Sequence, residues 1–198
     1  MKFDNPHVSP SSPRKGNAVT RWIGDAGLKL MGWKVAGRMP DIPKVVLIGA
    51  PHTSNWDALA ATFSMLAVGL HYTILVKKEW FFWPMGPIFR AVGGYPVDRG
   101  KGGQALVDQL TELVNLREQV VLGFPPEGTR SKVEKYKTGY LRVAYATGVP
   151  VFLAAFDGPG KRVVLDRLFE LTGDMAMDNA AIKAYVDATW TGINPEKQ

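Results

Sequence analysis

Short apolar runs rich in β-branched residues alternate along this chain with longer segments whose apolar residues recur at helical spacing. Strands are predicted at 45–48, 72–76, 95–97, 120–124, 149–156 and 162–165. Helices are predicted at 55–70, 104–116, 138–147 and 179–190, and a further helical stripe lies within 17–36. This alternation predicts an α/β domain with a mixed, largely parallel central sheet and helices on both faces.

A single domain accounts for the whole pattern. The chain has 198 residues, enough for one substantial core, and shows neither an internal repeat nor an interdomain linker. Residues 1–16 are rich in Pro and Ser and lack an apolar run, which predicts a flexible basic arm and not a secretory signal. Cys is absent, so disulfides, thiolate metal sites and a cysteine nucleophile are excluded.

Positive charge is concentrated near the start of the chain. Residues 1–40 hold seven cations and two anions, a net +5 out of +6 overall, which indicates an anionic partner or simply a solvated end. An apolar stripe follows, made of Val19, Trp22, Ile23, Ala26, Leu30 and Trp33. Such a stripe suits an interfacial amphipathic helix over 17–36 or, equally, a helix packed on the core.

No segment of the sequence has the roughly 20 consecutive apolar residues that a bilayer crossing requires. We therefore expect a cytoplasmic protein that lies on an anionic membrane surface, peripheral on the inner face of the cell membrane, without crossing it.

His52 follows the strand predicted at 45–48, at the strand end where α/β folds place functional groups. Ser54 or Asn55 can cap the next helix, which places Asp57 in its first turn. An Asp bonded to one imidazole nitrogen leaves the other nitrogen free to act as a base. The same spacing also suits an ordinary loop His beside a helix cap.

Two further polar clusters follow strands. After the strand at 120–124 come Pro125, Pro126 and then Glu127, Gly128, Thr129, Arg130 and Ser131. In this cluster Gly128 permits an unusual backbone and Arg130 can hold a phosphate through two hydrogen bonds. The other cluster contains Lys77 and, after a second short strand, Asp98-Arg99; its cations Lys77 and Arg99 can converge on an anion or remain solvated.

Together these clusters resemble the lysophospholipid acyltransferase family, which includes the bacterial 1-acylglycerol-3-phosphate acyltransferases. Its H-x4-D block, often with Ser two residues after the His, is matched by His52, Ser54 and Asp57. Its second block is matched by Lys77, Trp80, Gly86, Asp98 and Arg99. Its third and fourth blocks are matched by residues 126–131 and by Val149-Pro150-Val151, so the likeness covers about residues 45–155. Pro125 departs from the family pattern, which has a single proline after the aromatic residue.

The resemblance implies a glycerol-3-phosphate acyltransferase-like fold over 17–198 and a direct acyl transfer. His52 is the implied general base and Asp57 orients it, while Lys77, Arg99, Glu127, Gly128, Thr129, Arg130, Ser131 and Ser54 bind substrate. The donor is acyl-CoA or acyl carrier protein, and the acceptor is a lysophospholipid, foremost 1-acylglycerol-3-phosphate, in phospholipid biosynthesis. No metal or other cofactor is needed.

Other functions stay open on the sequence alone. The acceptor could be a lyso-ornithine lipid or another alcohol or amine. A hydrolase with Ser54 as nucleophile lacks a G-x-S-x-G elbow. A nonenzymatic module could bind lipid through the basic arm, whereas no nucleic-acid-binding motif is present and no nucleic-acid partner is expected.

Overall fold

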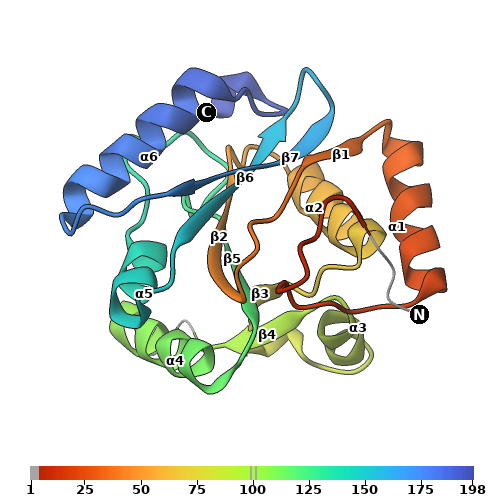
Figure 1. The fold of residues 1–198 in the computed structure, drawn as a ribbon, viewed down its shortest axis with the longest axis horizontal. Coiled ribbons are helices and arrows are strands. Elements are labelled where there is room, and N and C mark those ends of the chain that lie inside the picture. The colour runs from red at the N-terminus through yellow and green to blue at the C-terminus, as the bar shows by residue number, and fades with distance from the viewer. Residues whose placement is uncertain (1–4, 99, 101) are drawn as a thin grey trace.

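A seven-stranded sheet forms the centre of the computed structural model, which describes residues 5–98, 100 and 102–198 (Figure 1). The strands are β1 (Lys34–Gly37), β2 (Lys44–Ala50), β3 (Thr73–Lys77), β4 (Gly94–Val97), β5 (Val120–Phe124), β6 (Val151–Asp157) and β7 (Arg162–Phe169). Their spatial order is β1-β7-β6-β2-β5-β3-β4. Strands β6, β2, β5, β3 and β4 are parallel, whereas β7 is antiparallel to β6 and β1 runs alongside β7. The predicted fold class is confirmed.

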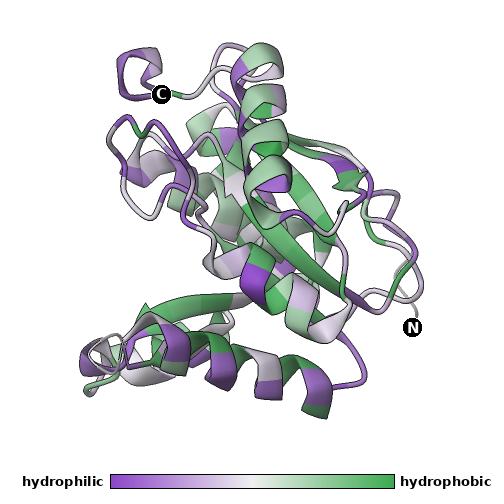
Figure 2. Cartoon of the chain, turned by 90° about the vertical axis from the view of Figure 1, so that its left-hand side faces the viewer, coloured by the Kyte–Doolittle hydropathy of each residue, from purple (hydrophilic) through white to green (hydrophobic). Residues whose placement is uncertain are grey.

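Helices cover both faces of this sheet. The helices are α1 (Ala18–Met31), α2 (Asn55–Val68), α3 (Met85–Ala91), α4 (Gly103–Leu116), α5 (Gly139–Thr147) and α6 (Met175–Thr189), with 3-10 turns η1 (Lys78–Trp80) and η3 (Pro195–Lys197). In Figure 1, α4, α5 and α6 lie to the left of the sheet and α2 and α1 lie to its right. Figure 2 shows apolar strands inside and helices of mixed hydropathy around them.

Strand alternation assigns each face its own core. Val46 and Ile48 pack toward Leu110 of α4 and Ile182 of α6 in one cluster. The next residues along β2, including Leu47, pack in a second cluster that holds Met65 and Val68 of α2. Residues that alternate along a strand point to opposite faces, so β2 is buried on both sides, as its unbroken apolar run predicted.

The two edge strands of the sheet are short. Strands β1 and β4 have four residues each, and β4 contains Pro96 opposite Val76 of β3. Proline has no backbone N–H to donate, so it is tolerated at a sheet edge and not in a central strand.

Helix α1 is shorter than the expected 17–36 helix and is an outer layer packed on α2. It ends at Gly32, which adopts a left-handed conformation (φ 69°), and Lys34–Gly37 then forms β1, which the sequence analysis missed. Gly24 and Gly27 allow a close approach: a Cβ on Gly24 would lie 2.3 Å from the backbone nitrogen of Ala67, and one on Gly27 would lie 2.5 Å from the Phe63 ring.

Because glycine lies on the packed side, most of the predicted apolar stripe faces outward, whereas Trp33, after the end of α1, packs against a core cluster. The exposed fractions of Trp22 and Leu30 are 69% and 91%. Among the described residues, every helix falls short of the length and apolar character that crossing a membrane demands.

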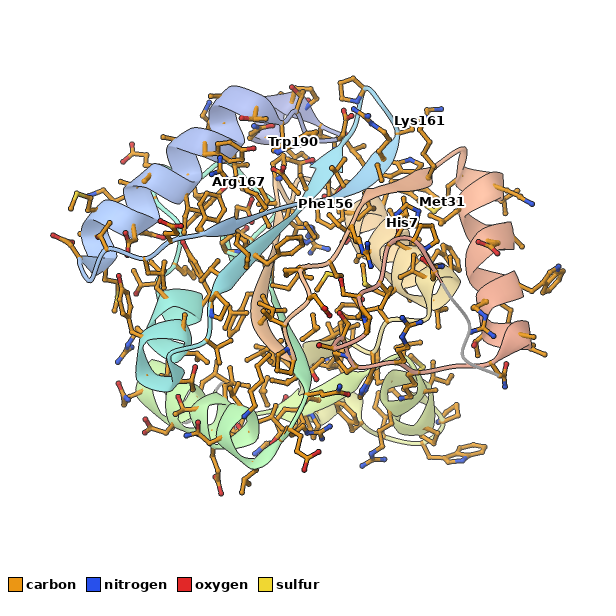
Figure 3. All side chains as sticks on the ribbon, in the orientation of Figure 1. His7, Met31, Phe156, Lys161, Arg167 and Trp190 are labelled. Atoms are coloured by element: carbon orange, nitrogen blue, oxygen red, sulfur yellow. The ribbon has the colours of Figure 1, made fainter. Side chains whose placement is uncertain are left out.

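Residues 5–16, expected to form a flexible arm, instead lie against the domain; residues 1–4 are outside the described part. Val8 is buried in the core cluster beneath α2, and the buried Ser9 hydroxyl donates to the carbonyl of Met39 at 2.5 Å. His7, labelled in Figure 3, lies with Nδ1 2.6 Å from the carbonyl oxygen of Gly37. Pro and Ser composition indicated no regular secondary structure here, but it does not report on packing.

Candidate active site

The loop between β2 and α2 brings the predicted pair together. After the cis peptide bond at Ala50–Pro51, His52 and Thr53 lead to Ser54, which caps α2 by accepting a hydrogen bond from the Trp56 amide at 3.2 Å. Asp57 is the third residue of the helix, and its carboxylate accepts from the Ser54 amide at 2.7 Å. This capping box fixes the carboxylate at the helix N-terminus, where the helix dipole favours negative charge.

The Asp57 carboxylate is fully buried, and one of its oxygens contacts three nitrogen atoms. Oδ2 accepts hydrogen bonds from the amides of Thr53 and Ser54, both at 2.7 Å, and lies 3.3 Å from Nδ1 of His52. The His52 side chain keeps 18% of its surface exposed, so its ring is accessible on one side. A buried carboxylate beside one imidazole nitrogen, with the ring open to a ligand, is the arrangement of a general base and its orienting group.

Glu127 lies behind this loop and braces it. Its Oε1 accepts a hydrogen bond from the His52 amide at 2.9 Å, while Oε2 is buried without a partner among the described residues. Burial raises the pKa of Glu127 above its ordinary value, and the hydrogen bond from the His52 amide opposes that rise only in part. Because β2 and β5 are paired parallel neighbours, their carboxyl ends place the two loops side by side.

His52 forms part of the wall of a cavity of about 650 Å³. Apolar side chains from both sides of the sheet make up most of the wall, including Leu47, Met65, Ile74, Leu106 and Phe156. The Phe156 ring, labelled in Figure 3, has its centroid 6.3 Å from that of the His52 ring. The volume falls within the roughly 300–1,000 Å³ typical of small-molecule sites.

Two cationic side chains line the same cavity. Arg130 and Lys137 belong to its wall together with Gly128 and Thr129, and the Arg130 guanidinium donates to the side-chain oxygen of Asn55, the first residue of α2. Gly128 has φ +64°, and a Cβ there would lie 2.7 Å from the Lys137 side chain. Glycine therefore permits both the turn and the close passage of this lysine.

The remaining predicted site residues have other positions. Ser54 is buried as the cap of α2, and Glu127 faces the His52 loop; within the part of the chain that the structure describes, neither belongs to the cavity wall. Ser131 and Lys77 are exposed, the latter at the carboxyl end of β3, and both also lie outside that wall. Arg99 lies outside the described residues.

Sequence reasoning missed Lys137 and Asn55. The available signal for Lys137 was its position directly before a predicted helix and ten residues after Glu127. Asn55 was recognised only as a possible cap, because nothing in the sequence links it to Arg130, 75 residues away. A second, open groove of about 770 Å³ between α4 and α5 contains none of the predicted site residues.

Comparison with known proteins gives a match to a family model and a match to a solved structure. The family model described as Acyltransferase matches residues 36–156, which include every predicted site residue. Among curated proteins none matches the chain. A solved structure, the 1-acyl-sn-glycerophosphate (LPA) acyltransferase PlsC from Thermotoga maritima, is similar with a TM-score of 0.59 and 17% identity, over 86% of this chain and 78% of that one. That likeness establishes the fold, and because the family model spans more than half of the sequence, the chain belongs to the acyltransferase family and is an acyl-transferring enzyme.

Proposed function

We propose that this enzyme transfers a fatty acyl group from acyl-CoA or an acyl carrier protein to a hydroxyl of a lysophospholipid, with 1-acylglycerol-3-phosphate the favoured acceptor. The observation that carries the proposal is the placement of His52. Its ring forms part of the wall of a mostly apolar cavity and lies 3.3 Å from a fully buried carboxylate.

In the proposed reaction His52 acts through Nε2, since Nδ1 lies against Asp57. Nε2 takes the proton of the acceptor hydroxyl while the oxygen of that hydroxyl attacks the thioester carbonyl carbon. The tetrahedral intermediate then collapses, the carbon–sulfur bond breaks, and the imidazolium returns the proton to the leaving thiolate. The Asp57 carboxylate stabilises the imidazolium between these two steps.

The apolar wall of the cavity supports an acyl thioester as the donor. Its wall is mostly aliphatic and aromatic, and an acyl chain buried there gains about 0.8 kcal/mol for each CH₂ removed from water. The same wall also carries polar side chains, among them His52, Thr129 and Arg130. An amphiphile with a long apolar tail and a polar reacting end matches this division.

A phosphate on the acceptor fits Arg130 and Lys137. Arg130 offers a planar set of donors suited to two phosphate oxygens, and Lys137 adds a compact charge from the same wall. Thr129 contributes a hydroxyl. We propose these three residues as the phosphate contacts, with Glu127 and Ser54 holding the loop of His52 in place. Lys77 and Arg99 stay proposed contacts for the outer part of a substrate.

A position on the inner face of the cell membrane is part of the proposal. Two exposed apolar surfaces support it, one on α1 and one over η1 and α3. The α1 surface consists of Val19, Trp22, Ile23 and Leu30. The surface over η1 and α3 consists of Trp80, Phe82, Trp83 and Ile88. Tryptophan and phenylalanine are favoured at bilayer interfaces, and each nearby Lys or Arg adds about 1 kcal/mol on anionic lipid. A lipid acceptor would then reach the enzyme without leaving the bilayer.

The test is acyl transfer from labelled palmitoyl thioesters, in CoA and carrier-protein forms, to a panel of lyso-lipids on anionic vesicles. We expect transfer to one acceptor by the wild type and by His7→Ala, a control histidine remote from the cavity, and loss of transfer in His52→Ala. The panel includes a lyso-ornithine lipid, which would identify the alternative acceptor. If wild type and His52→Ala transfer equally little to every acceptor yet bind vesicles equally, a nonenzymatic lipid-binding role is favoured instead.

A further inference from the structure

We propose that Asn194 is a positioning residue for the loop that carries His52. It lies in the segment 190–198, which follows α6 and includes η3. The family model ends at residue 156, so this segment lies outside the matched region. It nevertheless bonds directly to Thr53, the residue between the proposed base and the capping Ser54.

Thr53 is held from two directions. Its side-chain Oγ1 accepts a hydrogen bond from the backbone amide of Asn194 at 3.0 Å, and its carbonyl accepts from Nδ2 of Asn194 at 3.3 Å. Its own amide donates to Oδ2 of Asp57 at 2.7 Å. Thr53 is 1% exposed and Asn194 is half-buried, so the Thr53 groups that make these contacts are shielded from water, and an unmade hydrogen bond there is costly.

The segment that carries Asn194 is itself fixed at several points. Trp190, labelled at the end of α6 in Figure 3, donates through Nε1 to Asp166 of β7 at 2.9 Å. Gly192 donates its amide to Oε1 of Gln198 at 2.9 Å, and Nε2 of Gln198 donates to the Trp190 carbonyl at 2.7 Å. These bonds close the segment on itself, so it forms a rigid support behind Thr53.

Two glycines make the contact between this segment and the loop possible. A Cβ on Gly192 would lie 2.7 Å from both Cγ2 and Oγ1 of Thr53. A Cβ on Gly158, in the turn after β6, would lie 2.4 Å from the Gly192 carbonyl oxygen. Gly158 also donates its amide to the Thr191 carbonyl at 2.8 Å. Backbone therefore packs on backbone between Gly158 and Gly192, and the Gly192 backbone lies directly against the Thr53 side chain, with no room for a further side chain between them.

The hydrogen bonds around Thr53 determine how His52, the proposed base, lies relative to Asp57. Glu127 fixes the peptide unit before His52, through the His52 amide, and Asp57 fixes the peptide unit after it, through the Thr53 amide. Asn194 fixes the next carbonyl and the Thr53 side chain. Removing the Asn194 side chain frees the Thr53 carbonyl, which lets the loop rotate and lengthens the 3.3 Å separation between His52 Nδ1 and Asp57 Oδ2. This inference rests on the proposed roles of His52 and Asp57, and Asn194 itself contacts neither substrate nor the reacting atoms.

The test compares Asn194→Ala and Gly192→Ala with Glu196→Ala, an exposed control in the same segment. Loss of the part-buried hydrogen bond from Nδ2 of Asn194 to the Thr53 carbonyl predicts a fall of about threefold to tenfold in kcat for Asn194→Ala. Displacement of Thr53 by a new methyl group predicts about tenfold or more for Gly192→Ala. KM should stay within about twofold, because the cavity wall is unchanged. Thr53→Ser, which keeps the hydroxyl acceptor, should retain more kcat than Thr53→Val.

A spectroscopic measurement on the full chain separates positioning from general stability. The Nδ1–H proton resonance of His52, assigned by its loss in His52→Ala, should shift or broaden in Asn194→Ala and Gly192→Ala while both remain folded. It should be unchanged in Glu196→Ala. If Asn194→Ala and Gly192→Ala both keep wild-type kcat and an unshifted resonance, the inference is wrong although the proposed function stands. If His52→Ala is as active as the wild type, the proposed function fails first. Should Gly192→Ala not fold, Asn194→Ala and the Thr53 pair decide.

Discussion

Replacing Asp57 in two ways should separate its part in catalysis from its part in folding. Oδ2 of Asp57 accepts from the amides of Thr53 and Ser54 at 2.7 Å each, and the same oxygen lies against His52. Asp57→Asn keeps an oxygen acceptor for both amides but removes the charge that stabilises the imidazolium. Asp57→Ala removes the charge and leaves both amides without an acceptor.

The magnitudes differ for the two variants. A buried donor left unpaired costs about 1–3 kcal/mol, so two lost bonds predict roughly 2–6 kcal/mol for Asp57→Ala. That is a large part of a typical total stability of about 5–15 kcal/mol. At about 2–4 °C per kcal/mol for a chain of this size, the melting temperature should fall by roughly 4–24 °C. For Asp57→Asn the fall should stay within about 1 kcal/mol, because both bonds persist.

Activity should fall in both variants. Loss of the orienting carboxylate in a comparable His–Asp pair costs about 10⁴ in kcat, so we expect a loss of roughly 10²–10⁴ here. The assays are thermal unfolding followed by circular dichroism and acyl transfer measured well below each melting temperature. Asp57→Asn activity within about tenfold of wild type would refute the orienting role. A wild-type melting temperature for Asp57→Ala would refute the capping argument.

Three further predictions follow from the cavity, the buried acid and the exposed helix. Glu127→Gln should raise the melting temperature at neutral pH. Burial raises the pKa of Glu127 in the folded protein, so Glu127 loses its proton more readily in the unfolded chain, and the stability that it contributes falls as the pH rises above about 4.5. Thermal unfolding measured across pH should show that the advantage of Gln disappears below that value. Ala61→Phe, in the cavity wall, should shift preference toward shorter acyl thioesters in a competition assay, and unchanged preference would place the acyl chain elsewhere. Trp22→Ser with Leu30→Ser should weaken sedimentation with anionic vesicles by about tenfold or more. Met177→Ser, which changes another exposed apolar residue, on α6, should have no effect.

The regular elements of the fold could be predicted because their patterns are local. The run at 120–124 is β5 residue for residue, and the pattern at 104–116 is α4 to within one residue. Strand β1 could not be predicted, because its four residues are ordered by pairing with Arg162–Leu165, far along the chain. Helix α3 was missed because its seven residues contain Gly86 and Pro87, which are poor helix formers.

The site could be predicted only in part, for a related reason. His52 and Asp57 are joined by a capping box within one turn of chain, so their spacing reports their contact. The inward direction of Glu127 depends on a bond to His52, 75 residues away. The contact of Asn194 with Thr53 spans 141 residues and is carried by backbone groups and an amide, which leave no motif.

The shape of the two outermost strands matters for an enzyme that gathers on a surface. Confinement to a bilayer brings copies of a protein to high local concentration, where unpaired strand edges can join into aggregates. Here one outer strand has only four residues and begins with Lys34, and the other contains Pro96. A short charged edge and a proline edge both oppose the addition of a strand from another copy. The sheet is thereby protected against intermolecular polymerisation under the crowded conditions in which the enzyme is proposed to work.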